Sequence, residues 1–374
     1  KKMSITARDS HLGINSMMGY IDFNRNLYYC RRCEEGFAPF DKELDVNDEH
    51  RITKNLTETV CDLAQRMSSF KEAEEVLHKY LNIKASHSTI QKISEKVGRR
   101  LYEKEKSEAE ETYENQHQAI GDIPDHEKRG RIYIEADGSM VLIRGKGWKE
   151  IKLGMVFKDE TVLNRKRKRH IITEKDYVVS LGSAEEFKKM LLNAAIKNGY
   201  GRAKEVIILG DGAKWIWNAA DELFPDATFI LDYYHFEEHV YECANIIYPE
   251  DELARRRWAK VIIDGFMDNK IAETIENIRP EEYTDLIVKE EVKRLKTYLE
   301  NNHDKMKYKE YISKGYFIGS GAIESGHKHV LQQRLKLAGM SWSKEGAQYI
   351  ASLRAASKSD RWSDVTELIY GAVG

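Results

Sequence analysis

The segment Arg131–Val141, RIYIEADGSMV, alternates apolar and polar residues until it reaches Asp137 and Gly138, a pair that is common in turns. An alternation with period two predicts a β-strand, and Tyr133, Glu135 and Asp137 would then share one face of it. We therefore predict a strand that ends at Asp137 and presents a carboxylate at the edge of a sheet.

Two further acids occur in comparable settings. In EVIILGDGAKWIW, the apolar run Val206–Leu209 leads into Asp211 and then into a helix start, and Glu324 of GSGAIESGHKH lies just inside a helix that Gly319–Gly321 opens. Each acid alone fits an ordinary turn or a surface position. Together, two strand-end aspartates and a helix glutamate offer the oxygen ligands that a pair of Mg²⁺ ions requires, so the order predicts a metal site.

These carboxylates need no special environment to bind a cation. An aspartate has an ordinary pKa near 3.9, so we expect Asp137 and Asp211 to be ionised at pH 7. The positive end of the helix dipole would favour the ionised form of Glu324 as well.

The composition excludes several classes of protein. The 374 residues suffice for two or three domains, and 33% of them are charged. The mean hydropathy is −0.62, and no run of 18 apolar residues or secretory signal is present, so we expect a cytoplasmic protein. A net charge of −2 does not indicate nucleic-acid binding, so any DNA surface must come from local asymmetry. Four cysteines argue against a disulfide framework, and a chain starting at Lys1 leads us to expect a native start further upstream.

Residues 1–44 contain one pair of cysteines at zinc-knuckle spacing. Cys30 and Cys33 are followed by a glycine and an aromatic residue, as in one half of a zinc ribbon. A structural zinc needs four ligands, which His11 and His50 or an upstream pair could complete, while two structural thiols are the alternative. Cys61 and Cys243 stand alone in helical patterns, so we expect them to be buried thiols.

Apolar residues at three- and four-residue spacing predict helices between residues 45 and 120. A break before Ser86, which is a good N-cap, is compatible with a helix-turn-helix, and a plain three-helix bundle fits nearly as well. In a helix-turn-helix, the second helix (86–98) would present four polar side chains to a major groove, namely Ser88, Thr89, Gln91 and Lys92.

The following region predicts a sheet. RIYIEAD, SMVLIRG and EIKLGMVF read as three strands between residues 131 and 157, with turns at Asp137-Gly138 and at Gly145–Gly147. A run of five cations follows, which would attract a polyanion or form a solvated loop: Arg165, Lys166, Arg167, Lys168 and Arg169. Helices over 183–199 and from Lys214 to Pro225 flank the strand before Asp211, and ATFILD is the fifth strand.

The predicted order β-β-β-α-β-α-β is that of an RNase H-like mixed sheet, so we expect the α/β class. Polar helical segments from Asp251 to Ser313 then read as an all-α insertion. We therefore expect five parts: a zinc-ribbon-like segment (1–44), a helical DNA-binding domain (45–120), a first part of the catalytic core (128–250), the insertion (251–313), and core helices that carry Glu324 (314–374).

Four blocks together resemble the DDE transposases of bacterial insertion sequences, of the ISKra and ISLre types within the Mutator-like superfamily: EADGSMV, GDGAKWIW, ILDYYH and GSGAIESGHKHVLQQRLKLAGMSWS. The resemblance covers nearly the whole chain. It implies that Asp137, Asp211 and Glu324 bind two Mg²⁺ or Mn²⁺ ions. Asp232 and His235 match the family's [C/D]xxH signature. A single CxxC and a near-neutral charge depart from the pattern.

The resemblance implies metal-dependent cleavage of double-stranded DNA at element ends and strand transfer, by a dimer or higher assembly near the bacterial nucleoid. Glu135, Asp232 and His235 would support the acids, although His235 fits a hydrogen-bonded core histidine equally well. Further DNA contacts are expected from Lys328, Arg334 and Lys336. A catalytically silent DNA-binding protein and a glycosidase with a carboxylate pair are the rival functions.

Overall fold

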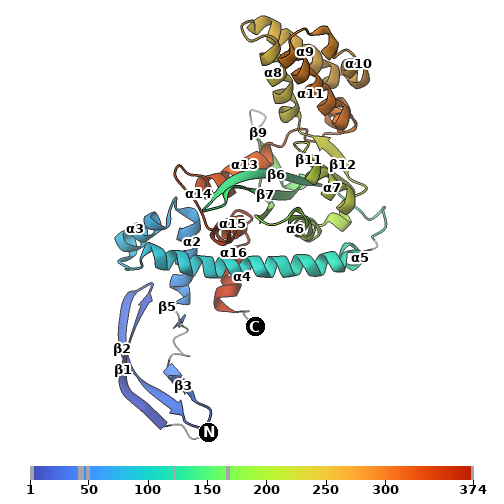
Figure 1. Cartoon of the computed structure of the whole chain (residues 1–374). Helices are drawn as coiled ribbons and strands as arrows, with labels where there is room; N and C mark the ends of the chain where they lie inside the picture. Colours follow the sequence, from blue (N-terminus) through green and yellow to red (C-terminus); the bar gives the residue numbers. More distant parts are fainter. Residues whose placement is uncertain (1–3, 41–45, 48–50, 122, 166–168, 372–374) are drawn as a thin grey trace. The chain divides into compact units, whose positions relative to one another are not determined.

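The computed structural model describes residues 4–40, 46–47, 51–121, 123–165 and 169–371 (Figure 1). The protein is a mixed α/β protein with mixed sheets and many helices. It divides into two compact units, one formed by Lys1–Ser107, Met140–Glu150 and Lys328–Gly374, and the other by Glu108–Ser139 and Ile151–His327. We call them the terminal unit and the sheet unit.

The sheet unit is built on a five-stranded mixed sheet with the strand order β10-β7-β6-β11-β12. Its strands are β6 (Arg131–Ile143), β7 (Gly147–Lys158), β10 (Asp176–Ser180), β11 (Glu205–Gly210) and β12 (Thr228–Leu231). β10 pairs antiparallel with β7, whereas β11 runs parallel to both β6 and β12. Because β6 and β11 are parallel, the residues that end their paired segments face the same edge of the sheet.

Two helices connect these strands in the predicted order. α6 (Ala184–Lys197) begins at Ser183, whose side chain accepts the backbone N–H of Glu186, and α7 (Lys214–Leu223) follows β11. The inward face of α6 is apolar and includes Phe187 and Leu191, which contact the sheet at Gly154, where a larger residue would clash. Apolar periodicity alone therefore placed both helices correctly.

Two predictions about the sheet are wrong. β6 does not end at Asp137 but continues to Ile143, because the polar-apolar alternation resumes after Gly138. Gly138 has no positive φ angle, and its N–H donates to Oδ1 of Asp137 at 2.6 Å, so the Asp-Gly pair is accommodated within a strand. The stretch 150–157 is consequently part of the second strand, and the third strand is β10, which follows the small β8–β9 hairpin (Val162–Arg165 and Arg169–Ile172).

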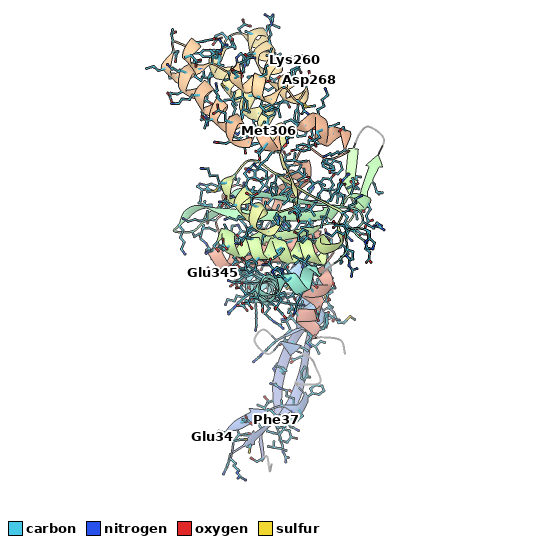
Figure 2. All side chains as sticks on the ribbon, turned by 90° about the vertical axis from the view of Figure 1, so that its right-hand side faces the viewer. Glu34, Phe37, Lys260, Asp268, Met306 and Glu345 are labelled. Atoms are coloured by element: carbon cyan, nitrogen blue, oxygen red, sulfur yellow. The ribbon has the colours of Figure 1, made fainter. Side chains whose placement is uncertain are left out.

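A helical segment follows β12. It consists of α8 (Tyr233–Ile247), α9 (Glu252–Met267), α10 (Ile271–Glu276), η3 (Pro280–Glu282), α11 (Leu286–Asn302), η4 (His303–Lys305) and α12 (Tyr308–Ser313). Residues 251–313, all of which the structure describes, contribute no strand. Phe236, Phe266 and Tyr308 pack ring against ring in its core. Figure 2 shows Met306 nearer to the sheet than Lys260 and Asp268, which lie further out.

The ends of this helical segment are joined to each other. The N–H of Tyr233, the first residue of α8, donates to the carbonyl of Ile318 at 2.8 Å, and the hydroxyl of Ser320 donates to Asp232. α13 (Gly321–Gly326) begins directly afterwards and carries Glu324. The chain therefore leaves the sheet at β12 and returns to the same place before α13.

The terminal unit begins with a long antiparallel hairpin of β1 (Ser4–Ser16) and β2 (Gly19–Cys30). The short strand β3 (Glu35–Phe37) pairs with β2, and β5 (Ile52–Thr53) pairs with β1. β4 (Val46–Asn47) in turn pairs with β5. Figure 2 shows Glu34 and Phe37 at one end of this hairpin. Its helices are α2 (Lys54–Arg66), α3 (Phe70–Leu81), the part of α4 (His87–Glu114) up to Ser107, α14 (Gln333–Leu335), α15 (Lys344–Lys358) and α16 (Trp362–Tyr370).

Residues 328–371 pack with the N-terminal helices, and Trp342 in this stretch also pairs with Ile143 at the end of β6. α15 and α16 both contact α2, and the guanidinium of Arg354 on α15 donates to the carbonyl of Gln65 on α2. Gly98 of α4 lies against the backbone of Tyr349, where a methyl group would be 2.5 Å from a carbonyl oxygen. Close helix packing and buried arginine hydrogen bonds thus hold the C-terminal helices in this unit.

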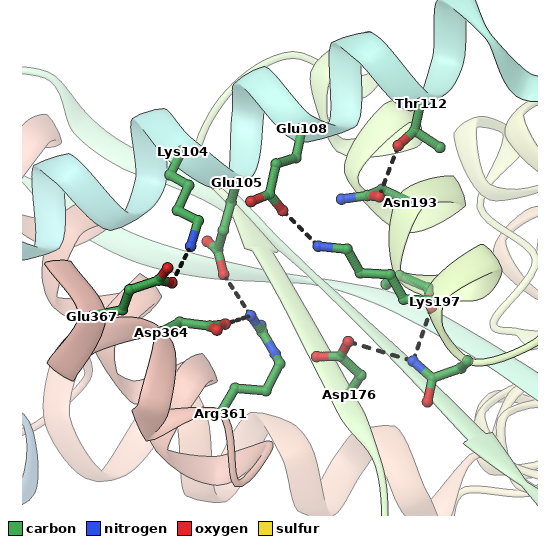
Figure 3. A network of polar contacts seen from close by, with 12 residues as sticks. Lys104, Glu105, Glu108, Thr112, Asp176, Asn193, Lys197, Arg361, Asp364 and Glu367 are labelled. Atoms are coloured by element: carbon green, nitrogen blue, oxygen red, sulfur yellow. Dashed lines mark hydrogen bonds and ion pairs between the residues drawn. The ribbon is translucent and has the colours of Figure 1, made fainter. Parts of the chain in front are cut away.

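Helix α4 belongs to both units, and polar contacts fix each part of it (Figure 3). In the terminal unit, Lys104 pairs with Glu367 at 2.9 Å, and Arg361 contacts Glu105 at 3.1 Å and Asp364 at 3.0 Å. In the sheet unit, Thr112 donates to the side chain of Asn193 of α6 at 2.9 Å, and Glu108 pairs with Lys197 at 2.5 Å.

Candidate functional site

The inner face of β6, formed by Tyr133, Glu135 and Asp137, contacts the chain segment 317–327 at three successive points. The hydroxyl of Tyr133 accepts the N–H of Phe317 at 3.4 Å. The carboxyl of Glu135 accepts the N–H of Ile323 at 2.8 Å. Nε2 of His327 lies 3.0 Å from Oδ2 of Asp137. The predicted alternation along β6 therefore positions the helix that carries Glu324.

Glu135 is the buried member of this series. Its side chain is 1% exposed, and burial raises its pKa to about 8 against the opposing effect of the Ile323 hydrogen bond. The carboxyl therefore lies under the first turn of α13, where it holds a backbone N–H that the short helix leaves free. In this structure Glu135 therefore positions the start of α13.

We call Asp137, Asp211 and Glu324 the acid edge. Asp211 follows β11 and accepts the N–H of Ala213 at 2.9 Å, and burial together with the charge of Asp137 raises its pKa. Burial and the charges of Asp232 and Asp137 also raise the pKa of Glu324. Asp137 is therefore close enough to the other two acids to repel both of them.

The pKa values of Asp211 and Glu324 are raised from their ordinary values. The dipole of α13 was expected to favour ionised Glu324, but that helix has only six residues, and desolvation and like charges outweigh its effect. For Asp211, desolvation is the largest cause and the neighbouring Asp137 adds to it. A cation placed among these groups would lower the free energy of their ionised forms.

Asp232 is buried next to the acid edge, and its carboxylate is hydrogen-bonded within the protein. It is 3% exposed, its Oδ1 caps α8 by accepting the N–H of Tyr234 at 2.8 Å, and its Oδ2 accepts the hydroxyl of Ser320. Its own N–H donates to the carbonyl of Gly210 at 2.9 Å. Asp232 thus links the strand before Asp211 with the start of the helix of Glu324.

His235 lies beside the acid edge and not in the core. Its charge would lower the pKa of both Asp211 and Glu324, and its side chain is 34% exposed. The ring packs against His239 rather than between Tyr233 and Tyr234. The alternative of a buried, hydrogen-bonded core histidine is therefore wrong.

Sequence reasoning missed three residues of this region. His239 follows His235 by one helical turn, and the HxxxH spacing was a usable signal. His327 stands in the quoted GSGAIESGHKH block but was not singled out. Tyr298 comes from α11, and no sequence pattern links it to the site, yet its ring packs on His239 at 4.5 Å and its side chain contacts the Cα region of Gly212.

Several buried polar atoms near the acid edge lack a well-directed hydrogen bond. The hydroxyl of Tyr298, whose pKa burial and Asp211 raise, has no hydrogen-bond partner, and neither ring nitrogen of buried His327 makes a well-directed hydrogen bond. Such atoms beside mutually repelling carboxylates fit a site that a cation and its ligands complete. Within the described part of the chain, however, no three His, Cys, Asp or Glu side chains form a ready metal cage.

The carboxylate oxygens of the acid edge are of the donor type that Mg²⁺ prefers. Mg²⁺ is usually held by one or two carboxylates together with waters and substrate phosphates, whereas a structural zinc has four protein ligands. The chemistry of the donors therefore fits the predicted ion, and its full coordination stays a prediction.

The residues that we expected at a DNA surface have different environments in the structure: some are exposed, and others make hydrogen bonds within the protein. Ser86 accepts the N–H of Thr89 at 3.3 Å and so caps α4, and Gln91 donates to Glu95 at 2.7 Å, while Ser88 and Lys92 are exposed. Lys328 and Lys336 are exposed as well. Lys166, Arg167 and Lys168 lie outside the described residues, and the structure gives no side-chain position for Arg165 and Arg169.

The expectation that Arg334 contacts DNA is wrong, because this side chain is buried. This side chain is 1% exposed, donates to the carbonyls of Ala64 and Ser68, and lies over the rings of Phe70 and Trp342. A buried guanidinium cannot reach a phosphate, because its charge is already used within the protein. The basic pattern of its helix did not reveal which cations face inward.

The cysteines follow the expectations in part. Cys61 and Cys243 are fully buried in α2 and α8, as predicted for isolated thiols. Cys30 ends β2, and contact with its sulfur is the largest cause of the raised pKa of Cys33. His11 pairs with Asp22 instead of facing these thiols, and His50 lies outside the described residues. Zinc at this pair stays a prediction.

Comparison with known proteins now adds a family. The model of the family described as "Uncharacterised protein family (UPF0236)" matches residues 1–367. The chain belongs to this family. Two UPF0236 proteins of Caldanaerobacter subterraneus subsp. tengcongensis are 26% and 24% identical to it over 383 and 379 residues, covering 99% of this chain and 73% and 72% of theirs. The UPF0236 protein in the vanSb 3′ region of Streptococcus gallolyticus is 22% identical over 363 residues and covers 92% and 72%.

A solved structure shows a distant likeness to this UPF0236 chain. The Drosophila P element transposase strand transfer complex matches with a TM-score of 0.26 and 10% identity, covering 83% of this chain and 80% of the other. In addition, no helix in the described ranges combines the length and the apolar character needed to cross a membrane.

Proposed function

We propose that this UPF0236 chain is a DNA transposase with an RNase H-like core, in which Asp137, Asp211 and Glu324 cleave phosphodiesters and transfer strands at the ends of an insertion sequence. The observation that carries the proposal is the acid edge. Two acids on parallel strands and a third on a helix that β6 holds in place interact electrostatically, although 187 residues separate the first from the last (324 − 137).

The order of the sheet supports the proposal. The three-strand part β10-β7-β6 continues into the parallel strands β11 and β12, with helices between them, as expected for an RNase H-like core. The acids follow or lie on neighbouring parallel strands, where α/β proteins place their ligands. Glu324 joins them because Asp232 and Glu135 bind both sides of the segment before it.

The relatives support it in a different way. The name of one UPF0236 protein of Caldanaerobacter subterraneus joins eleven locus designations, and that of another joins four. Many near-identical genes in one genome are expected of an element that copies or moves itself. A housekeeping enzyme gives no reason for such multiplicity.

The chemistry would run in two displacements. A water oxygen attacks the scissile phosphorus in line and the 3′ oxygen leaves, and the freed 3′-hydroxyl then attacks a phosphodiester of the target in the same way. When bound by the acid edge, Mg²⁺ or Mn²⁺ supplies Lewis-acid stabilisation of the attacking and leaving oxygens. Glu135 and Asp232 keep the glutamate's helix in register, and His235 offers a positive charge beside Asp211 and Glu324 when protonated.

Cleavage of a plasmid that carries the DNA flanking this gene tests the proposal. We expect the chain to nick or cut that plasmid with Mg²⁺ and not with EDTA, and to lose this activity in Asp211→Asn and Glu324→Gln. Asp226→Asn, an exposed carboxylate change after α7, is the matched control and should keep full activity.

The rival function is a catalytically silent DNA-binding protein of transposase descent. It predicts binding to the flanking DNA with no Mg²⁺-dependent product in any variant. Cleavage that persists in Asp211→Asn would contradict the assignment of the acid edge itself. Both functions require phosphate contacts, because such contacts do not depend on catalysis. We propose that the run from Arg165 to Arg169, together with Lys328 and Lys336, makes these contacts.

A further inference from the structure

Helix α8 places His235 and His239 one turn apart, with their Nε2 atoms 3.2 Å from each other. Two nitrogen atoms that each present a lone pair repel at this distance unless a proton or a cation lies between them. A tetrahedral Zn²⁺ with bonds of about 2.0–2.1 Å holds two nitrogen ligands about 3.3–3.4 Å apart. The separation in α8 therefore matches that of two ligands of one ion.

The opposite nitrogen of each ring faces a carboxylate. Nδ1 of His235 lies 3.5 Å from Glu238, and Nδ1 of His239 lies 3.4 Å from Glu242. A carboxylate at Nδ1 favours the tautomer that carries its proton there and leaves Nε2 free as a ligand. This carboxylate–histidine arrangement is what commonly orients histidines around a metal.

We propose that His235 and His239 form a two-histidine site for a divalent first-row transition metal such as Zn²⁺. The site is separate from the Mg²⁺ sites of the acid edge, although it adjoins them through the charge interaction of His235 with Asp211 and Glu324. Imidazole nitrogen favours zinc, cobalt, nickel and copper, while carboxylates and phosphates favour magnesium. The two sites would therefore select different ions.

The remaining coordination positions are open to other ligands. Tyr298 packs its ring on His239, and its hydroxyl is buried without a partner. No third His, Cys, Asp or Glu completes a cage within the described part of the chain, so waters or an oxygen of the substrate would fill the other positions. Two histidines supply one ligand fewer than a catalytic zinc centre, so at least two coordination positions stay open to water or substrate.

Metal titration of the full chain tests this site. Cys30→Ser and Cys33→Ser are introduced first, so that the thiol pair cannot bind the added ion. We expect this background protein to bind one Co²⁺ or Zn²⁺ per chain, with excess Mg²⁺ present, as followed by cobalt absorption or by competition with a chromophoric chelator. His235→Gln and His239→Gln should each weaken this binding at least tenfold. His303→Gln, a change in the exposed turn η4, should leave it unaltered.

Two results would overturn the proposal. One is binding that survives in both histidine variants and disappears in Asp211→Asn, which would assign the ion to the acid edge. The other is no binding beyond that of the variants, which would leave a proton shared between the imidazoles. X-ray absorption of the cobalt-loaded background protein measures the ligands directly and does not depend on the folding of a variant. We expect it to show two imidazole ligands. Mg²⁺-dependent plasmid cleavage is measured without zinc, so failure of either proposal is seen separately.

Discussion

The two units bury charge in opposite ways. In the terminal unit, Arg354 is 2% exposed and all three of its guanidinium nitrogens donate to backbone carbonyls, those of Gln65, His329 and Val330. At the acid edge of the sheet unit, Asp211 has one backbone donor and a like charge nearby. Burial lowers the pKa of Arg354 to about 10, and it stays protonated at pH 7.

The difference is between a buried charge whose hydrogen bonds the protein supplies and carboxylates that the protein leaves to repel each other. A buried charge that serves the fold has its hydrogen-bonding capacity filled by the protein. Carboxylates kept near one another without a protein cation cost folding free energy, and such groups concentrate at sites that bind a ligand. Four changes would break or sharpen this contrast, and they follow in order of expected effect.

Asp211→Asn should have the largest effect, on activity alone. Under the proposed function, Mg²⁺-dependent cleavage should fall by at least about 10³-fold, because the proposal makes Asp211 a metal ligand in the transition state. The free energy of unfolding should stay the same or rise, since the repulsion with Asp137 disappears. Product formation on gels and urea denaturation measure the two quantities. A variant that loses stability in proportion to activity would make Asp211 a structural acid.

Arg354→Met should have the reverse effect, on stability. Three carbonyls lose their donor, so we expect the free energy of unfolding to fall by about 3–5 kcal/mol. Arg66→Met is the matched control in α2, where an exposed i,i+4 pair with Asp62 is worth roughly 0.5 kcal/mol or less. Equal losses in the two variants would show that the carbonyl contacts contribute little.

Glu135→Gln should change the pH dependence of stability. The pKa of Glu135 is raised to about 8 in the folded protein, so its favourable contribution is complete below the unfolded value near 4.5 and declines as the pH rises to about 8. One pKa unit corresponds to about 1.4 kcal/mol, and relaxation of the site reduces the total effect. We therefore expect the pH-dependent fall in the free energy of unfolding to be smaller in the variant by on the order of 2 kcal/mol. Glutamine retains an acceptor for Ile323. Parallel pH profiles for both proteins would contradict the buried state of Glu135.

Gly212→Ala should have the smallest effect. Gly212 has φ +101°, and an added methyl group would lie 3.2 Å from Leu231 and 3.4 Å from Tyr298. We expect a loss of about 1 kcal/mol in thermal or urea unfolding, together with weaker cleavage because Asp211 is next in the chain. Gly121→Ala has φ +71° and no neighbour within 4 Å, so it measures backbone strain alone. If both variants lose the same free energy of unfolding, the close approach of Leu231 and Tyr298 to Gly212 adds nothing to the backbone strain.

The sequence predicted what depends on local periodicity and could not predict what depends on distant contacts. Alternation along 131–137 placed Glu135 and Asp137 on the correct face, and the apolar run before Asp211 placed the second acid. Asp137-Gly138 misled the strand boundary because a side chain hydrogen bond stabilises that pair within a strand. Arg334 resembles an exposed cation in sequence, because its inward orientation depends on the ring of Phe70 in α3, 264 residues earlier (334 − 70), and on the ring of Trp342, which lies outside its own helix.

The helical segment between Asp232 and Ser320 has a consequence for how this family can evolve. Its two ends are hydrogen-bonded to each other, so the chain between them enters and leaves at one point. The entropy of closing such an excursion grows only slowly with its length. The outer helices, from about residue 250 to 285, can therefore be lengthened, trimmed or exchanged for another module while the acids at the base keep their positions.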